Sequence, residues 1–525
     1  MGSYSIGVID ITIVVLYLLF IVWWGLKNGK SSDAQSYFLA GRSMPWWVVG
    51  LSLFAASISS TTLIGQSGDA YHTGLAVFNY NLTGVLVMIF FAIFLLPLYI
   101  RSKIFTIPEF LEKRFDKRSR YYFSAICIVG NIFLDAAGAL YAAALIIKLI
   151  FPQADIQLII FVFAVIVASY TIPGGLSSAI NAELIQAVVL IVGSIILSYF
   201  CYQQGGDYFI NLFQSDDILV KLIRPLSDSA TPWLGLIVGM PILGIYFWAN
   251  NQTLVQRVLS SKTIDEGRKG VMLTGFLTMS TLFIIAIPGL ISRDLFPGLE
   301  KPDMVYPNMV MRLMPVGLLG VILAALLSAL TSTVSAILNS TSTLFTMDFY
   351  AQYNKKAEVK KLVLVGKIAS CIIIVLAALW APQIGKFGSL LKYYQEMLSY
   401  ISPPIVAAFL LGIFNKRVNG NGTFIGLLAG LLVAILLLFF KDDIVESLHF
   451  LFVVPFLFTF SMIVIYVSSL FFIVPDKEKF VDTTFSFKEL KEEYIALKHV
   501  VWYKNYQIWA CILLGMSLLI WIIFG

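Results

Sequence analysis

Charged side chains are scarce in this sequence. Asp, Glu, Lys and Arg make up 13% of its 525 residues, while hydrophobic residues make up 59%. A soluble domain carries about 25% charged residues, because polar and charged groups cover much of its water-facing surface. The composition therefore excludes a soluble globular protein and predicts a chain that lies mostly within a lipid bilayer.

Cysteines and external glycosylation sites are also sparse. The four cysteines all fall in apolar stretches, so no extracellular disulfide framework is predicted: Cys127, Cys201, Cys371 and Cys511. The Asn-x-Ser/Thr triplets lie inside apolar stretches or on the predicted cytoplasmic side, at Asn81, Asn251, Asn339 and Asn421. These absences favour a bacterial inner membrane over an animal plasma membrane.

Apolar stretches long enough to cross the bilayer are what the sequence has in abundance. A spanning helix needs about 20 apolar residues, and lipid leaves the backbone no alternative except a closed barrel. We therefore predict an all-α membrane protein with about fourteen transmembrane helices, at 7–27, 45–68, 74–100, 121–150, 155–172, 177–202, 233–255, 268–292, 314–347, 360–380, 390–414, 421–440, 447–474 and 505–525.

The basic residues predict how the chain is oriented. Most of its 36 Lys and Arg residues lie in alternate loops, and the densest group is at 101–120. The side richer in Lys and Arg is cytoplasmic by the positive-inside rule, so an even number of crossings places both termini outside the cytoplasm. The net charge of +6 is thereby explained by topology, and a nucleic-acid partner is not expected.

The second apolar stretch has an unusual centre. Residues 55–62 are small or hydroxyl-bearing, with Ser57, Ser59, Ser60, Thr61 and Thr62 among them. Such side chains compete for backbone hydrogen bonds and weaken a helix. A helix opened at the bilayer centre frees carbonyl groups, which is tolerated where they line a cavity or bind an ion.

The ninth stretch offers oxygen ligands to match. Ala329, Ser332 and Thr333 share one helix face by their spacing. Two carbonyls from the break, the Ala329 carbonyl and two hydroxyls would form a neutral five-oxygen site suited to Na⁺, whereas a divalent ion would require carboxylates. The alternative interpretation is that these small residues only allow close helix packing.

Six segments in this order resemble the sodium:solute symporter family, in particular its sodium/sugar cotransporter branch. They are 37–47 (YFLAGRSMPWW), 106–115 (TIPEFLEKRF), 170–177 (YTIPGGLS), 255–257 (VQR), 288–293 (PGLISR) and 338–348 (LNSTSTLFTMD). The resemblance covers nearly the whole chain.

The resemblance implies an inverted-repeat fold of the leucine-transporter type. An extra N-terminal helix lies within 1–30, two five-helix repeats span 45–202 and 233–414, and three peripheral helices occupy 421–525. It also implies a sodium site on Ala55, Ile58, Ala329, Ser332 and Thr333, which agrees with the oxygen ligands inferred from the residues.

Substrate positions follow from the same resemblance. They fall on Thr62, Asn81, Gly244, Thr278 and Gln395, of which only Gln395 keeps the residue type of the family's bacterial galactose transporter. The set is polar and uncharged, which suits a neutral solute such as a sugar. Aromatic residues that cover sugars in this family correspond to Tyr80, Tyr246, Phe247 and Trp248.

Glu183 is the main ionisable residue predicted inside a span, where a charge is costly unless it is partnered. It is expected to hold a second cation or to support the first ion site. Asp135 and Glu396 also lie within predicted spans.

The predicted function is sodium-coupled symport of a small neutral polar solute, a sugar, by alternating access. The alternatives are symport of a monocarboxylate, sugar acid, polyol or amino acid, and a non-transporting substrate sensor. The sequence shows no signalling module after its last apolar stretch. It also lacks a nucleophile elbow or HExxH motif, so an enzyme is not expected.

Overall fold

The computed structural model describes residues 7–28, 34–58, 61–151, 153–228, 230–385, 390–444 and 449–525. Within these ranges the chain is nearly all helical, and two isolated β-bridges are the only extended pairings. The predicted all-α class is confirmed.

Helices long and apolar enough to cross a membrane number thirteen in the described residues, or fourteen if one bent pair is counted as a span. They correspond in order to the predicted stretches. The first half of the chain contains α1 (Val8–Asn28), the bent pair α3 (Trp46–Ser57) and α4 (Ser67–Thr73), α5 (Asn79–Phe90) with α6 (Leu96–Arg101), α8 (Lys117–Gly130) with α9 (Ala137–Ile150), and α10 (Ile156–Gln214). The second half contains α11 (Trp233–Val238), α12 (Met240–Ile245) and α13 (Gln252–Leu259), α14 (Ile264–Thr281) with α15 (Ile287–Leu295), α17 (Leu318–Thr343) with α18 (Ala351–Tyr353), α19 (Val359–Ile384), α20 (Leu390–Phe414), α21 (Gly420–Ile444), α22 (Phe450–Leu470) and α24 (Tyr506–Phe524).

Shorter helices connect the spans: α2 (Ala34–Leu39), α7 (Ile107–Arg114), α16 (Val305–Leu313) and α23 (Phe487–Leu497). Several spans also contain a π-helical turn, in which the backbone bonds shift from i−4 to i−5. These turns are η2 (Thr61–Gln66), η4 (Phe91–Leu95), η5 (Asn131–Ala136), η7 (Tyr246–Asn250), η8 (Leu282–Ala286) and η10 (Leu344–Tyr350).

The predicted interruption of the second span is confirmed. Helix α3 ends at Ser57, and Ile58 has non-helical dihedral angles (φ −81°, ψ 86°). The helix resumes in η2 and α4, and the two segments are bent by 64°. Ser59 and Ser60 lie outside the described residues.

The predicted span at 233–255 is found, but its helix is interrupted near the end. The π-helical turn η7 ends at Asn250, Asn251 is extended (φ −71°, ψ 116°), and α13 begins at Gln252. Asn251 Oδ1 accepts a hydrogen bond from the Thr253 backbone nitrogen at 2.8 Å, which is the geometry of an N-cap. Each predicted repeat therefore begins with an interrupted helix, although the equivalence of the two repeats stays a prediction.

The gap between the predicted spans 155–172 and 177–202 contains a turn at Gly175. The residue has φ +61° inside the long helical run of α10, and it lies at the end of span Ile156–Leu176, just before span Ser178–Gln214. A Cβ atom there would come within 2.6 Å of the Tyr37 ring. Both the dihedral angle and the close approach therefore require glycine.

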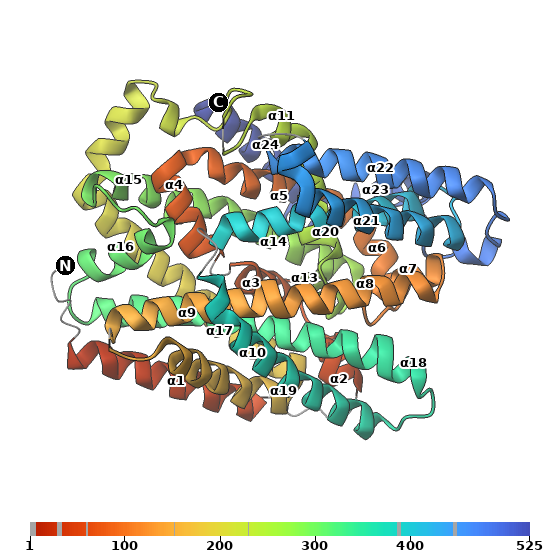
Figure 1. The fold of residues 1–525 in the computed structure, drawn as a ribbon, viewed down its shortest axis with the longest axis horizontal. Coiled ribbons are helices and arrows are strands. Elements are labelled where there is room, and N and C mark those ends of the chain that lie inside the picture. Colours follow the sequence, from red (N-terminus) through yellow and green to blue (C-terminus); the bar gives the residue numbers. More distant parts are fainter. Residues whose placement is uncertain are drawn as a thin grey trace.

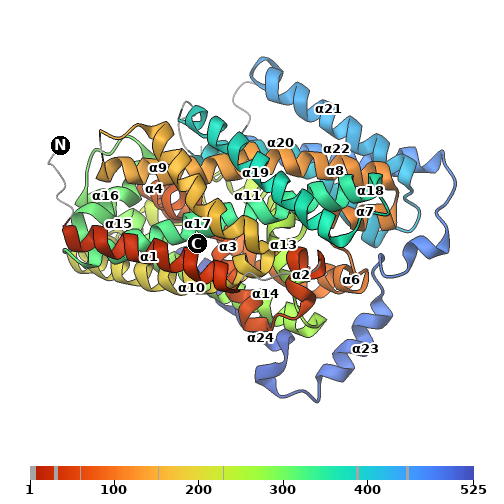
Figure 2. The same cartoon turned by 90° about the horizontal axis from the view of Figure 1, so that it is seen from below.

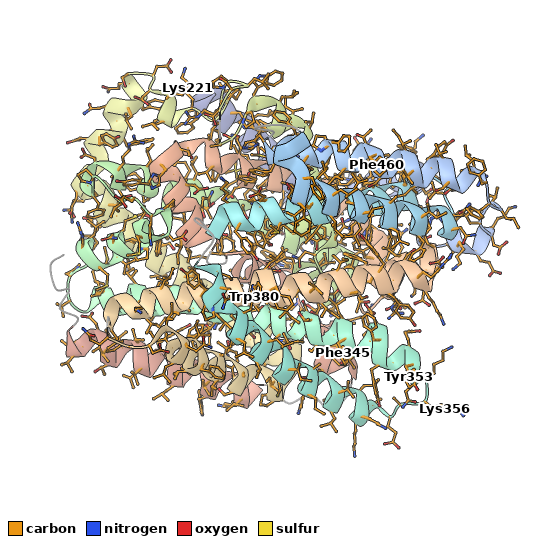
Figure 3. All side chains as sticks on the ribbon, viewed as in Figure 1. Lys221, Phe345, Tyr353, Lys356, Trp380 and Phe460 are labelled. Atoms are coloured by element: carbon orange, nitrogen blue, oxygen red, sulfur yellow. The ribbon has the colours of Figure 1, made fainter. Side chains whose placement is uncertain are left out.

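Helix α17 occupies the middle of the bundle. It packs most extensively against α10 and also against α1, α3, α9 and α13 (Figures 1 and 2). In the span Leu318–Tyr353, which contains α17, 94% of the most apolar 18-residue stretch is buried inside the protein. Large apolar side chains face outward instead from the surrounding helices, and Phe345 and Trp380, labelled in Figure 3, are among those exposed. An apolar surface of this kind is what a lipid-facing protein requires.

Both ends of the described chain are held by hydrogen bonds to other parts of the bundle. Near the start, Asp10 Oδ1 accepts hydrogen bonds from the Gly317 and Gly320 backbone nitrogens, each at 2.7 Å. Near the end, the Phe524 carbonyl accepts one from the Leu222 nitrogen at 2.6 Å.

Candidate functional site

The predicted sodium ligands meet where the break after α3 faces α17. Ser332 Oγ lies 3.1 Å from the Ala55 carbonyl oxygen and 2.9 Å from the Ala329 carbonyl oxygen. Thr333 Oγ1 lies 2.9 Å from the same Ala329 oxygen. All these residues are buried. The structure thus brings two backbone carbonyls and two hydroxyls together from segments far apart in the sequence.

This group of oxygens fits a monovalent cation. Every member is neutral, and hard cations prefer oxygen ligands. Without an ion the two hydroxyls donate to the carbonyls, and with an ion they can turn their lone pairs toward it. Ile58, the fifth predicted ligand, is buried at the first non-helical position of the break, where its carbonyl is released from the α3 ladder.

Eight of the nine positions that the resemblance assigns to the solute line one cavity, and Tyr246 is not among its lining residues. The eight come from η2, α5, α12, η7, α14 and α20, and are Thr62, Tyr80, Asn81, Gly244, Phe247, Trp248, Thr278 and Gln395. The cavity volume is about 100 Å³. Ile58 also lines it, so this cavity and the predicted ion ligands share the break after α3.

Several lining residues were not predicted from the sequence. They include Ser57, Gln66, Met240, Leu243 and Tyr394. Gln66 follows Thr62 by four positions and Tyr394 directly precedes Gln395, so helical spacing and adjacency were the available signals. None of the cavity-lining residues in the described part of the chain is Asp, Glu, Lys or Arg.

Polar atoms around the cavity are only partly paired. Asn81 Nδ2 donates to Thr281 Oγ1 at 2.6 Å and to Gln66 Oε1 at 3.4 Å, and Thr62 Oγ1 donates to the Ser57 carbonyl at 3.3 Å. In contrast, Gln66 Nε2 and Thr278 Oγ1 are buried with no protein partner. Such atoms are costly unless something else bonds to them.

Aromatic side chains form another part of the cavity wall. Phe247 and Trp248 make an edge-to-face pair with ring centroids 5.1 Å apart. Trp248 fits against α5 because Gly84 has no side chain: a Cβ at that position would lie 2.6 Å from the indole Nε1. Flat apolar faces beside hydrogen-bonding groups suit a ligand with both polar edges and a C–H face.

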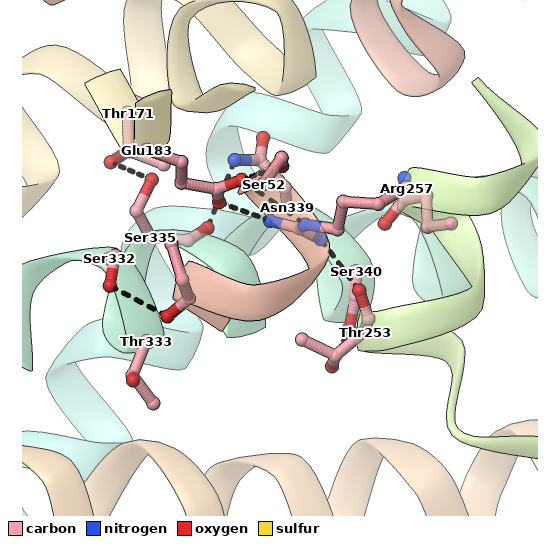
Figure 4. A network of polar contacts seen from close by, with 12 residues as sticks. Ser52, Thr171, Glu183, Thr253, Arg257, Ser332, Thr333, Ser335, Asn339 and Ser340 are labelled. Atoms are coloured by element: carbon pink, nitrogen blue, oxygen red, sulfur yellow. Dashed lines mark hydrogen bonds and ion pairs between the residues drawn. The ribbon is translucent and has the colours of Figure 1, made fainter. Parts of the chain in front are cut away.

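Glu183 is engaged in a fully buried ion pair. Its Oε1 lies 2.6 Å from Arg257 Nη2, and neither side chain is exposed to solvent. Ser52 Oγ on α3 donates to Glu183 Oε2, and Arg257 Nη1 donates to the Thr253 carbonyl at 2.7 Å. Figure 4 shows this pair together with Ser332 and Thr333. The carboxylate therefore contacts the helix that carries Ala55, and its predicted role as a support or second ion site stays a prediction.

Asp348 holds a second buried charge network near α7. It accepts hydrogen bonds from Thr106 Oγ1 at 2.7 Å, from Arg120 Nη2 at 2.6 Å and from Ser124 Oγ at 2.5 Å. Arg120 also pairs with Glu112 at 2.6 Å. The segments 106–115 and 338–348, noted from the sequence, thus meet through this carboxylate.

Asp135 lies beside the two sites. It lines a small cavity together with Thr333, Asn251 and Tyr394, and its carboxylate hydrogen-bonds with Tyr394. Tyr394 also lines the larger cavity, so one side chain borders both.

Similarity to known proteins covers most of the chain. The sequence model described as "Sodium:solute symporter family" matches residues 37–430. Solute carrier family 5 member 4 from Rattus norvegicus is 34% identical over 472 residues, which are 81% of this chain and 70% of the rat protein. Sodium/glucose cotransporter 1 from Ovis aries is 32% identical over 521 residues, or 88% of this chain and 78% of the sheep protein.

Solved structures show the same architecture. A Na⁺-coupled sialic acid symporter, in a substrate-bound outward-open state, superposes with a TM-score of 0.80 at 23% identity and covers 90% of this chain and 100% of the symporter. Mhp1, a nucleobase-cation-symport-1 family transporter, gives a TM-score of 0.57 at 13% identity over 86% of this chain and 99% of its own. The predicted leucine-transporter type of fold agrees with both.

Proposed function

Because the chain belongs to the sodium:solute symporter family, we propose that it couples the entry of Na⁺ to the uptake of a small neutral polar solute, a sugar. The observation that carries this proposal is the break after α3. The same interruption contributes Ala55 to the group of ion-binding oxygens and Ile58 to the wall of the solute cavity.

Sodium would act by tying two helices together. With Na⁺ between the carbonyls of Ala55 and Ile58 on one side and Ala329, Ser332 and Thr333 on the other, the break after α3 is held against α17. Thr62 and Asn81 are then presented to the solute from η2 and α5. Loss of the ion on the opposite side of the membrane releases this contact, so sodium binding and solute binding favour the same conformation.

The gradient provides enough energy for accumulation. One Na⁺ moving through about 100 mV releases roughly 2.3 kcal/mol, and a tenfold concentration gradient adds about 1.4 kcal/mol.

The lining of the cavity supports a neutral solute. A carboxylate solute would need a cation to offset its buried charge, and none lines the described cavity wall. The Phe247–Trp248 pair and the amides of Asn81 and Gln395 match the C–H faces and hydroxyl groups of a sugar. The names of the curated relatives, sodium/glucose cotransporters among them, point to the same class. A monocarboxylate, sugar acid or amino acid fits this lining less well.

We also propose that both termini lie outside the cytoplasm of a bacterial cell. The basic loop ends, such as 101–120, then face the cytoplasm. A C-terminal fusion that is active only outside the cytoplasm, such as a periplasmic phosphatase, should be active, and activity of a cytoplasmic reporter there would contradict the orientation.

Uptake into proteoliposomes tests the function. With an imposed Na⁺ gradient, one labelled sugar from a panel of sugars, polyols and acids should accumulate, and an equal proton gradient should drive none. Changing Ser332→Ala and Thr333→Ala together should abolish the sodium dependence of that uptake. Accumulation driven by protons, or unchanged sodium dependence in the double variant, would contradict the proposal.

A further inference from the structure

Gln66 lies at the cavity wall in a polar environment that fixes the direction of its amide. It ends the π-helical turn η2 directly after the broken segment, and its side chain is buried, with 4% of the residue exposed. The residue lines the solute cavity beside Tyr80 and Asn81. Its position is therefore suited to contact a bound solute.

A chain of hydrogen bonds with a defined polarity leads to this amide. Thr281 Oγ1 donates its single hydrogen to the Thr278 carbonyl at 2.6 Å, and a carbonyl can only accept. Asn81 must therefore donate to Thr281 Oγ1, which orients Nδ2 toward that hydroxyl. The second hydrogen of Nδ2 is then available for Gln66 Oε1 at 3.4 Å.

The polarity of the chain leaves Gln66 with a free donor. Its acceptor oxygen is engaged by Asn81, while its Nε2 is buried with no partner in the protein. A buried donor without a partner is unfavourable, so a ligand that supplies an acceptor gains more than one that supplies a second donor.

We propose that Gln66 determines solute specificity by donating a hydrogen bond to an oxygen of the transported solute. The proposal rests on the proposed function and specifies it further: at this position the solute must present a hydroxyl, ether or carbonyl oxygen as an acceptor. Thr278 Oγ1, also unpartnered on the cavity wall, can donate or accept and so imposes no direction of its own.

Analogues of the transported sugar separate acceptors from donors. In a deoxy sugar the hydroxyl is replaced by hydrogen and can neither donate nor accept, whereas in a deoxyfluoro sugar fluorine retains a weak acceptor. For wild-type protein in proteoliposomes, competition with the labelled sugar should reveal one ring position where the deoxy analogue binds about tenfold more weakly, a loss of one hydrogen bond. At that position the fluoro analogue should bind within about threefold of the parent.

The variants Gln66→Glu and Gln66→Met test the assignment. Glu replaces the donor by an acceptor of the same shape, so uptake of the parent sugar should fall by about 100-fold or more, since two facing acceptors repel and a charge is left buried. Met keeps the length and volume without a donor, so it should retain uptake but bind the deoxy and fluoro analogues equally well. Gln204→Glu, an exposed position on α10, is the matched control and should behave as wild type.

The outcomes distinguish the two proposals. If wild-type protein accumulates no sugar with sodium, the proposed function is wrong and this inference falls with it. If wild-type protein accumulates a sugar but Gln66→Met keeps the fluoro-over-deoxy preference, only the role of Gln66 is wrong. If Gln66→Glu does not reach the membrane in folded form, the Met variant decides alone.

Discussion

The proposed solute cavity and the Glu183–Arg257 pair handle buried polarity in opposite ways. Glu183 and Arg257 are fully buried, form an ion pair with each other, and each makes a further hydrogen bond. In the cavity no lining residue in the described ranges is charged, yet Gln66 Nε2 and Thr278 Oγ1 have no partner. The contrast indicates which polar groups hold the protein together and which are left for a ligand.

The physical reason lies in the cost of each arrangement. An unpaired buried charge costs several kcal/mol, so it persists only where its partner is built into the protein. An unpaired neutral donor or hydroxyl costs about 1–3 kcal/mol, which a transporter can tolerate in its solute-free state. The unpaired groups on the cavity wall are therefore ones that a neutral ligand can satisfy.

The largest expected effect comes from breaking the buried ion pair. Arg257→Met removes the cation and leaves the Glu183 carboxylate uncompensated, which should lower the free energy of unfolding by about 3–5 kcal/mol. Thermal unfolding of purified protein in detergent measures the change. The double variant Arg257→Met with Glu183→Gln should recover most of the loss, because no unpaired charge remains. Equal losses in the single and double variants would mean that the pair is not the stabilising feature.

Two neighbouring threonines of α14 provide the next test. Thr281 is fully buried, and its hydroxyl both donates and accepts, so Thr281→Val should cost about 1–3 kcal/mol of stability by leaving Asn81 unsatisfied. Thr278→Val removes an unpartnered hydroxyl and should leave stability unchanged or slightly higher. It should nevertheless weaken solute binding by about tenfold, the value of one hydrogen bond.

For this comparison to hold, Thr278→Val must lower the affinity for the solute without lowering stability. Unfolding in detergent gives the stability of each variant, and the solute concentration for half-maximal uptake gives the affinity. A Thr278→Val protein that is destabilised as much as Thr281→Val would show that its hydroxyl has a structural partner after all.

Local patterns explain what the sequence could predict. The spans follow from apolar length alone, because lipid permits a crossing chain little besides a helix. The break after Ser57 was visible as a run of hydroxyl residues. The break at Asn251 was missed although four polar residues follow one another at 250–253, because the capping hydrogen bond from the Thr253 nitrogen to Asn251 Oδ1 is defined only by the structure.

Non-local contacts explain what the sequence could not predict. Glu183 and Arg257 meet on α10 and α13, and no spacing rule links positions so far apart. The cavity residues were placed by family resemblance, and all of them except Tyr246 line one cavity. Gln66 was missed because its importance depends on the direction of the hydrogen bonds from Thr281 through Asn81, which only three-dimensional neighbours define.

Asp10 provides an intermediate case, since its partners are backbone amides and not a cation. It bonds to the Gly317 and Gly320 nitrogens at the start of α17 and, through Oδ2, to the Gly7 nitrogen at 3.1 Å. A carboxylate there satisfies free amides and faces the positive end of the helix dipole. Asp10→Asn should cost about 1 kcal/mol in the free energy of unfolding, and Asp10→Ala up to about 2 kcal/mol.

The order of stability of Asp10→Asn and Asp10→Ala tests whether Asp10 caps the start of α17. Both should be measured by thermal unfolding, with Thr12→Ala as the control, since the exposed Thr12 hydroxyl bonds only within α1. If Asp10→Asn and Thr12→Ala have the same effect, the amides of α17 do not depend on this carboxylate.

The smallest effects are expected where α23 meets the bundle through ion pairs of unequal burial. Arg101 and Glu489 are 40% and 52% exposed, whereas Arg268 and Glu493 are 6% and 26% exposed. Exposed pairs are weakened by solvent and salt, so Glu489→Gln should change stability by less than about 0.5 kcal/mol.

Glu493→Gln should cost about 1 kcal/mol or more in the free energy of unfolding, because Arg268 is held over the Tyr506 ring and by the Ala92 carbonyl and cannot turn out to water. Unfolding at low and at 1 M salt separates the two, since salt should abolish the first difference and retain much of the second. Equal sensitivity to salt would show that burial does not set the strength of these pairs. The contrast between the neutral cavity wall and the buried Glu183–Arg257 pair would then no longer follow from the cost of burying a charge.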